Sequence, residues 1–115
     1  MKKFFTFCAG LITLLFTGCH CRTTEVPQNA VLLDVRTEAE FAERHIPGSI
    51  LIPHDKINSE ISGKVPDKDT PIAVFCRSGR RSAIAKEKLE ALGYNNVYNL
   101  GSLEDAAETL NLKIE

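Results

Sequence analysis

The chain has 115 residues, and its 14 Lys and Arg against 15 Asp and Glu give a formal net charge of −1. This length corresponds to one domain, and a composition with 43% hydrophobic and 25% charged residues argues against a disordered chain. The near-zero charge also argues against a nucleic-acid binder, which needs a basic excess to neutralise phosphates. Four cysteines in so short a chain suggest a disulfide scaffold, but they are unevenly placed.

The N-terminal segment is typical of an export signal. Lys2 and Lys3 precede an uncharged, mainly apolar stretch over residues 4–18. As a helix this stretch would span roughly 22 Å, which is short of the ~30 Å hydrocarbon core of a membrane. A cleaved signal is therefore favoured over a spanning helix or a buried helix of the domain. We predict a signal peptide at residues 1–18.

The end of this segment, Leu15-Phe16-Thr17-Gly18-Cys19, resembles the lipobox of bacterial lipoproteins. The resemblance implies that Cys19 is lipidated and tethers an exported, periplasmic domain to a membrane without spanning it. Phe16 stands where Leu is usual, and cleavage to a soluble secreted or periplasmic form is the alternative. We interpret residues 19–30 as a linker, because residues 20–30 show no periodicity. Cys19-His20-Cys21 supplies too few ligands for a structural zinc site, and no metal is expected.

The remaining residues, 31–115, alternate short apolar runs with segments of helical character. Thr37 and Glu40 have the spacing of a capping box and predict a helix to about Arg44 that buries Phe41. The sequence Ile46-Pro47-Gly48 ends that helix. Strands are predicted at 31–35, 50–52, 72–75 and 96–100, and further helices at 54–61, 82–92 and 103–110.

The helix at 82–92 has the clearest pattern. Its apolar stripe is expected to contain Ile84, Leu89 and Leu92, with Ala85 beside it. Lys88 would lie on the same stripe, with its ammonium group reaching water. Gly93 follows as the glycine that ends the helix. Strands that alternate with helices predict an α/β fold with a parallel sheet of four to five strands and helices on both faces. In such sheets ligands bind beyond the carboxyl ends of the strands.

Two features lie at that edge of the expected sheet. Asp34-Val35-Arg36 ends the first strand, and the loop from Cys76 to Ser82 (Cys-Arg-Ser-Gly-Arg-Arg-Ser) joins the third strand to a helix. Backbone N–H groups in such a loop and the helix dipole favour anions, and the arginines add donors suited to oxyanions. A Cys in that setting should have a lowered pKa. A strand-end Cys is usually a buried apolar residue and an Arg-rich loop usually solvated surface, but their coincidence here favours a nucleophilic sulfur in an oxyanion cradle.

Residues 31–101 resemble the rhodanese family of thiosulfate sulfurtransferases, in particular its small exported bacterial members of the phage-shock type. The matching segments, in chain order, are Leu33-Asp34-Val35-Arg36, Glu40-Phe41, His45-Ile46-Pro47-Gly48-Ser49, the Cys76–Ser82 loop and Leu92-Gly93-Tyr94. The chain departs from the family in lacking most of an extra strand and helix before residue 31. It also has Gly101-Ser102 where Gly-Gly-aromatic is usual, which predicts a more open pocket on that side.

The resemblance offers two chemistries, which the loop length distinguishes. The phosphatase and arsenate-reductase relatives use a loop one residue longer than that of rhodaneses, and a Cys-x5-Arg signature would need Arg at position 82. That position is Ser, and Arg81 makes the spacing Cys-x4-Arg. Sulfur transfer is therefore favoured, with a phosphatase-like enzyme as the weaker alternative. A persulfide carrier or sulfur-binding module without efficient thiosulfate turnover also remains open.

The resemblance implies a double displacement in which Cys76 takes the outer sulfur of thiosulfate as a persulfide and passes it to cyanide or a thiol, without a cofactor. Arg77 and Arg81 are expected to bind the thiosulfate oxyanion, with Arg80 supplementary, while Ser78 and Gly79 supply backbone donors. Ser82 is expected to cap the following helix. Asp34 is expected to hold the loop or to pair with an arginine rather than to act as a general base, and Arg36 to pair with an acidic residue. His45 is expected to stabilise a turn.

Overall fold

A computed structural model describes residues 25–115 of the chain. The predicted signal peptide (1–18), Cys19 and the first part of the predicted linker (19–30) lie outside the described residues. No helix within 25–115 is long and apolar enough to cross a membrane.

The described residues form one parallel sheet with helices around it. The strands are β1 (Val31–Asp34), β2 (Ile50–Leu51), β3 (Ile72–Cys76) and β4 (Val97–Ser102). The helices are α1 (Glu38–Glu43), α2 (Ile57–Lys64), α3 (Arg80–Ala91) and α4 (Leu103–Leu110), and a 3-10 turn, η3 (His54–Lys56), leads into α2. The order of strands and helices confirms the predicted alternation, with four strands in the described sheet.

The sheet order is β2-β1-β3-β4, and every neighbouring pair is parallel. Because all the strands point the same way, the ends of β1 and β3 meet at one edge of the sheet, as the sequence predicts. Leu33 pairs with Val74 in register, and Asp34 pairs with Phe75. This register places the segment after Asp34 beside the loop that begins at Cys76.

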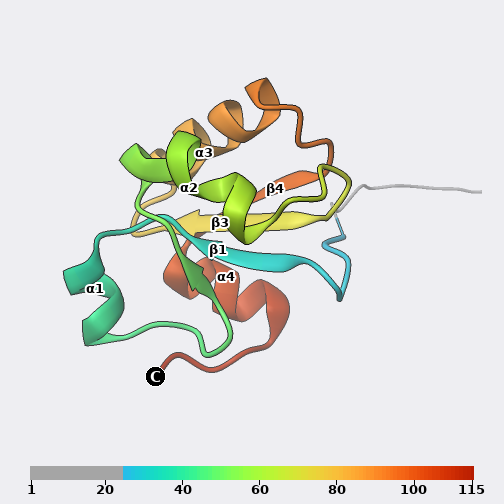
Figure 1. Ribbon diagram of the computed structural model, residues 1–115. Coiled ribbons are helices and arrows are strands. Elements are labelled where there is room, and N and C mark those ends of the chain that lie inside the picture. Colours follow the sequence, from blue (N-terminus) through green and yellow to red (C-terminus); the bar gives the residue numbers. More distant parts are fainter. Residues whose placement is uncertain (1–24) are drawn as a thin grey trace, which may run out of the picture.

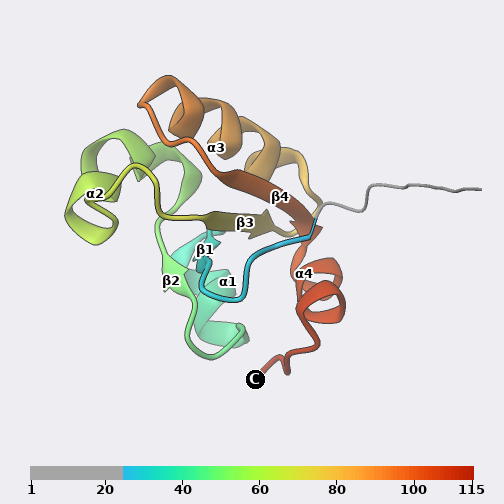
Figure 2. The ribbon, with the colours of Figure 1, turned by 90° about the vertical axis from the view of Figure 1, so that its right-hand side faces the viewer.

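Helices cover both faces of the sheet (Figure 1). The larger buried cluster lies under α2 and α3 and includes Leu33, Val74 and Leu89. The smaller cluster lies under α4 and includes Phe75 and Leu103. The view in Figure 2, turned by 90°, shows α3 and α4 on opposite sides of β3 and β4. β3 is buried along its whole length, which explains its unbroken apolar sequence.

Local sequence signals explain most helix boundaries. The Thr37 hydroxyl accepts a hydrogen bond from the Glu40 backbone N–H, and the Glu40 carboxylate accepts one from the Thr37 backbone N–H, so the predicted capping box is confirmed. At the end of α3, Gly93 has a φ of +101°, a left-handed conformation that glycine adopts without the steric cost of a Cβ. α4 spans the predicted residues and begins with a second capping box between Ser102 and Asp105.

Two expectations about packing were wrong. Phe41 is half-buried and stacks on the His45 ring, with 4.0 Å between ring centroids, because α1 lies at the end of the sheet and covers no core. Ile84 is 42% exposed. The buried residues of α3 are Ser82, Ala85 and Leu89, so the predicted burial of Ala85 and Leu89 is confirmed, and the helix begins two residues earlier than expected.

Candidate active site

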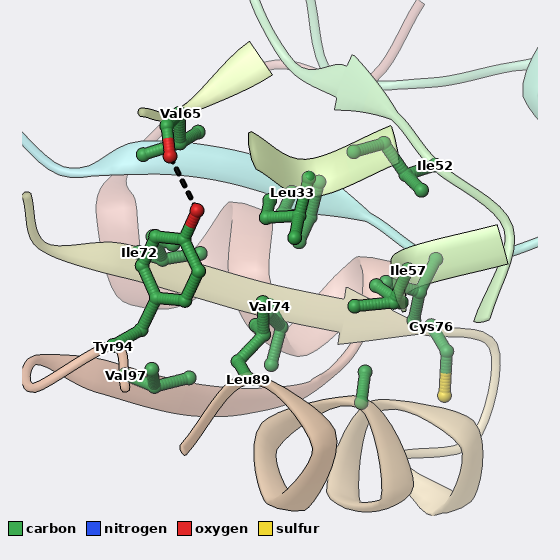
Figure 3. Close-up of a cluster of buried hydrophobic side chains, with 13 residues drawn as sticks. Leu33, Ile52, Ile57, Val65, Ile72, Val74, Cys76, Leu89, Tyr94 and Val97 are labelled. Atoms are coloured by element: carbon green, nitrogen blue, oxygen red, sulfur yellow. Dashed lines mark hydrogen bonds between the residues drawn. The ribbon is translucent and has the colours of Figure 1, made fainter. Parts of the chain in front are cut away.

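Cys76 is the last residue of β3 and the first of the loop that precedes α3. Its side chain is fully buried and belongs to the cluster under α2 and α3. Figure 3 shows the sulfur at one end of that cluster, directed toward α3, while Tyr94 lies at the other end. Cys76 is the only cysteine among residues 25–115 and is a free thiol, so the disulfide-scaffold idea does not apply to the folded domain.

The loop closes around the sulfur through its own backbone. The Gly79 N–H donates to Cys76 Sγ at 2.9 Å, and the Ser82 Oγ lies 3.6 Å from the same sulfur. Burial raises the pKa of the Cys76 thiol, but hydrogen bonds from Ser82 and from the backbone at Ser78 and Gly79 outweigh it. The net effect lowers the pKa, in the direction predicted from the loop sequence.

Gly79 makes this turn possible. Its φ of +94° belongs to the left-handed region, and it stands as the N-cap of α3 without a side-chain cap. A Cβ at Gly79 would lie 3.4 Å from the Gly101 Cα, so the end of β4 packs directly against the loop.

Ser82 does not cap α3, contrary to our prediction. It lies within the first turn, is fully buried, and its Oγ lies 3.0 Å from the Gly79 carbonyl oxygen. The prediction failed because glycine in a left-handed conformation lets the helix begin at Arg80, before a capping side chain is reached. Ser82 is instead a polar group placed beside the sulfur.

The three loop arginines differ in how exposed their side chains are and in how closely they contact Glu40. The Arg81 side chain is 24% exposed and donates to Glu40 from Nη1 at 3.0 Å and from Nη2 at 3.2 Å. The Arg77 side chain is 79% exposed, with Nη1 3.8 Å from Glu40, and Arg80 is exposed. Arg77 and Arg80 are therefore free to meet an incoming anion, while Arg81 is held in place and keeps three further N–H donors.

Glu40 was not identified as a site residue from the sequence. The Arg81 hydrogen bonds lower the pKa of its carboxyl from 4.5 to about 2, against the opposing effect of burial. The pairing with Glu40 likewise raises the pKa of Arg81. An acidic residue in the third position of a helix that follows a strand end, opposite an arginine-rich loop, is the signal that could have revealed this contact.

Asp34 and Arg36 form the ion pair that the sequence suggested. Both are buried, and the Arg36 Nε and Nη2 donate to the Asp34 carboxylate at 2.9 and 2.8 Å. Arg36 Nη2 also donates to the Arg44 carbonyl at 2.8 Å, which ties the end of α1 to the end of β1. The pair therefore helps to fix the helix that carries Glu40.

A cavity of about 370 Å³ lies beside the loop, between α1, Arg77 and the start of α4. Three arginines (Arg36, Arg44 and Arg77) and three glutamates (Glu40, Glu43 and Glu104) line it. Arg44 and Glu104 pair across it.

His45 serves as a structural residue, as predicted, because its Nδ1 lies 2.9 Å from the Phe41 carbonyl.

Comparisons with known proteins agree with this geometry. The Rhodanese-like domain family matches residues 24–108. The chain is 40% identical over 75 residues to the thiosulfate sulfurtransferase PspE of Escherichia coli (strain K12), covering 65% of this chain and 72% of that protein. It is 37% identical over 73 residues to the thiosulfate sulfurtransferase GlpE of Pseudomonas fluorescens (strain Pf0-1), covering 64% of this chain and 65% of that protein.

A solved structure described as a rhodanese with anions from E. coli is similar in fold. It superposes with a TM-score of 0.64 at 38% sequence identity, covering 66% of this chain and 89% of that one. Both kinds of comparison thus point to the same group of proteins as the loop sequence.

Proposed function

The chain belongs to the rhodanese family and is a sulfurtransferase, and we propose that it moves sulfane sulfur from thiosulfate to a thiol or to cyanide through a persulfide on Cys76. The observation that carries this proposal is the 2.9 Å hydrogen bond from the Gly79 N–H to the Cys76 sulfur, made inside an arginine-bearing loop. A buried sulfur with backbone donors aimed at it is suited to carry negative charge.

In the first step, the Cys76 thiolate attacks the outer sulfur of thiosulfate. A bond forms between Sγ and that sulfur, the sulfur–sulfur bond of thiosulfate breaks, and its electron pair leaves with sulfite. The anionic persulfide keeps the single negative charge of the thiolate. The loop N–H groups that stabilise the thiolate also stabilise the persulfide, since both place an anion inside the same turn.

In the second step, an acceptor nucleophile attacks the outer sulfur of the persulfide. With cyanide the product is thiocyanate, and with a thiolate it is a persulfide of that thiol. In both cases the Cys76 thiolate is regenerated. In this proposal Arg77 and Arg80, which are exposed, neutralise the sulfonate group of thiosulfate, and Arg81 adds its charge from its position against Glu40. Two moderate steps replace one direct transfer between anions.

The proposal is tested by measuring thiocyanate formation from thiosulfate and cyanide. The unaltered protein and Cys21→Ser should both turn over, while Cys76→Ser should show none. Turnover of an aryl phosphate instead of thiosulfate would contradict the proposal in favour of a phosphatase. A protein that accepts sulfur from a persulfide but does not react with thiosulfate would contradict the donor and favour a carrier.

We also propose that the protein is exported to the periplasm and tethered to a membrane through a lipid on Cys19. Support comes from the sequence alone, namely the apolar segment and the Thr17-Gly18-Cys19 end. Growth with labelled palmitate should label the protein but not Cys19→Ser. Labelling of neither, with the protein soluble in the periplasm, would favour simple cleavage.

A further inference from the structure

Asn99 lies on β4 and connects the loop to the strand beside it. It pairs with Val74 in the sheet, and the register then shifts so that Cys76 pairs with Ser102. The Asn99 Oδ1 lies 2.7 Å from the Ser82 Oγ and 2.9 Å from the Gly101 backbone nitrogen. One side-chain oxygen therefore contacts both the hydroxyl beside the Cys76 sulfur and the backbone that packs on Gly79.

These contacts fix where the Ser82 proton lies. The Gly101 N–H can only donate, so the Asn99 atom that faces it is the carbonyl oxygen rather than the amide nitrogen. The same oxygen faces Ser82, so the Ser82 hydroxyl must donate its single proton to make that 2.7 Å bond. A hydroxyl that donates to Asn99 presents lone pairs toward the sulfur, and it can accept from the Cys76 S–H but cannot donate to a thiolate.

The hydroxyl thus has competing acceptors. Asn99 Oδ1 is nearest at 2.7 Å, the Gly79 carbonyl lies at 3.0 Å, and the Cys76 sulfur at 3.6 Å becomes a strong acceptor once it is negative. Ser82 is fully buried, while Asn99 is exposed at the surface.

We propose that Asn99 is a positioning residue for the Cys76 nucleophile, because it holds the Ser82 proton away from the sulfur and so favours the thiol over the thiolate. The inference rests on the proposed function of Cys76 and deepens it. When the sulfur becomes a thiolate or a persulfide anion, the Ser82 hydroxyl must leave Asn99 in order to donate to it. Asn99 therefore sets the balance between the resting thiol and the reactive anion.

Other charged groups around the sulfur act on the same balance, and a neutral substitution of Asn99 leaves them in place. One such pair is Arg81 with Glu40. The charges of Cys76 and Asp34 also raise the pKa of Arg81, so these groups are coupled. Further charged or titratable groups on the elements around the loop include Arg36, Arg77, Arg80, Asp105, Lys88 and His54.

The test is a titration of the Cys76 thiolate in the full chain. The ultraviolet absorbance of the thiolate is followed against pH, and the signal of the matching Cys76→Ser protein is subtracted. Asn99→Ala should move the midpoint to lower pH, by up to about one pH unit for the loss of one hydrogen bond. Asn99→Asp should move it to higher pH, because a carboxylate holds the Ser82 proton more strongly and adds negative charge.

The decisive comparison repeats the measurement with Ser82→Ala. If Asn99 acts through the Ser82 hydroxyl, Asn99→Ala should cause no further shift in that background, and the shift caused by Asn99→Asp should shrink. An unchanged midpoint in Asn99→Ala, or an equal shift with and without Ser82, would overturn the proposal. Circular dichroism checks folding, and if Asn99→Ala does not fold, the Asn99→Asp pair decides. The titration needs no thiosulfate, so its result is separate from failure of the sulfurtransferase assay.

Discussion

The Glu40 carboxylate holds the Arg81 guanidinium through two hydrogen bonds, of 3.0 and 3.2 Å, across a sequence separation of 41 residues. The same carboxylate accepts the Thr37 backbone N–H at 2.9 Å and completes the cap of α1. One side chain thus begins a helix and fixes an arginine of the Cys76–Ser82 loop. The local folding of α1 and the geometry of the site are coupled through it.

Glu40→Gln should therefore impair substrate binding. An amide cannot offer Arg81 two carboxylate oxygens, so Arg81 loses its fixed position and the KM for thiosulfate should rise by about threefold to tenfold, corresponding to roughly 0.7–1.4 kcal/mol. Steady-state kinetics measure the effect. Glu38→Gln, an exposed change on the same helix that does not line the cavity, is the control and should leave KM unchanged. A lower KM in Glu40→Gln would show that Glu40 competes with thiosulfate for Arg81.

The lowered pKa of Glu40 makes part of the stability dependent on pH. The folded pKa of about 2 lies below the ordinary value of 4.5, so the carboxylate stabilises the fold above about pH 4.5, and this contribution is lost as the pH falls toward 2. The difference in free energy of unfolding between the unaltered protein and Glu40→Gln should shrink over that range. Urea unfolding at about pH 7 and about pH 3 tests this, and a difference that stays constant would contradict it.

Gly79→Ala should affect activity more than stability. The left-handed φ of +94° costs an alanine about 1–2 kcal/mol, and relief of that strain would turn the Gly79 N–H away from the sulfur. Loss of a hydrogen bond to a charged sulfur should lower kcat by about tenfold to a hundredfold. Gly63→Ala, in α2 with open space around it, is the matched control. Full activity in Gly79→Ala would mean that the 2.9 Å contact does not support the reaction.

Tyr94→Phe should destabilise the domain without touching the chemistry. The buried Tyr94 hydroxyl donates to the Val65 carbonyl, and its removal leaves that carbonyl unpaired at a cost of about 1–3 kcal/mol. Figure 3 places Tyr94 at the opposite end of the cluster from Cys76, so kcat and KM should not change. Thermal unfolding and kinetics measure both, with the half-buried Tyr98→Phe as control. A large loss of activity at temperatures where Tyr94→Phe is folded would contradict this separation.

Signals that depend on neighbouring residues in the sequence predicted the fold well. The spacing of Thr37 and Glu40 was enough to place the start of α1, and the unbroken apolar run before Cys76 was enough to place a buried parallel strand. The start of α3 was misplaced because a left-handed glycine at position 79 ended the loop early. A pattern of side chains does not show backbone conformation, so Ser82 was taken for a cap.

Contacts between distant segments could not be derived from the sequence. Glu40 and Asn99 reach the loop only because the register of the sheet brings β1, β3 and β4 to one edge. Each makes a hydrogen bond to a loop residue far away in the sequence: Glu40 lies 41 residues from Arg81, and Asn99 lies 17 residues from Ser82. The shift in register between the Val74–Asn99 pair and the Cys76–Ser102 pair has no signature that a pattern of apolar residues reveals.

The central claim is that Cys76 carries sulfur as a persulfide, and intact mass measurement tests it most directly. The purified protein is incubated with thiosulfate, freed of excess reagent and weighed by mass spectrometry. We predict a gain of one sulfur atom that maps to the peptide containing Cys76, is absent in Cys76→Ser and disappears on addition of cyanide. A protein that forms thiocyanate without ever gaining the sulfur, or that gains it equally in Cys76→Ser, would contradict the account.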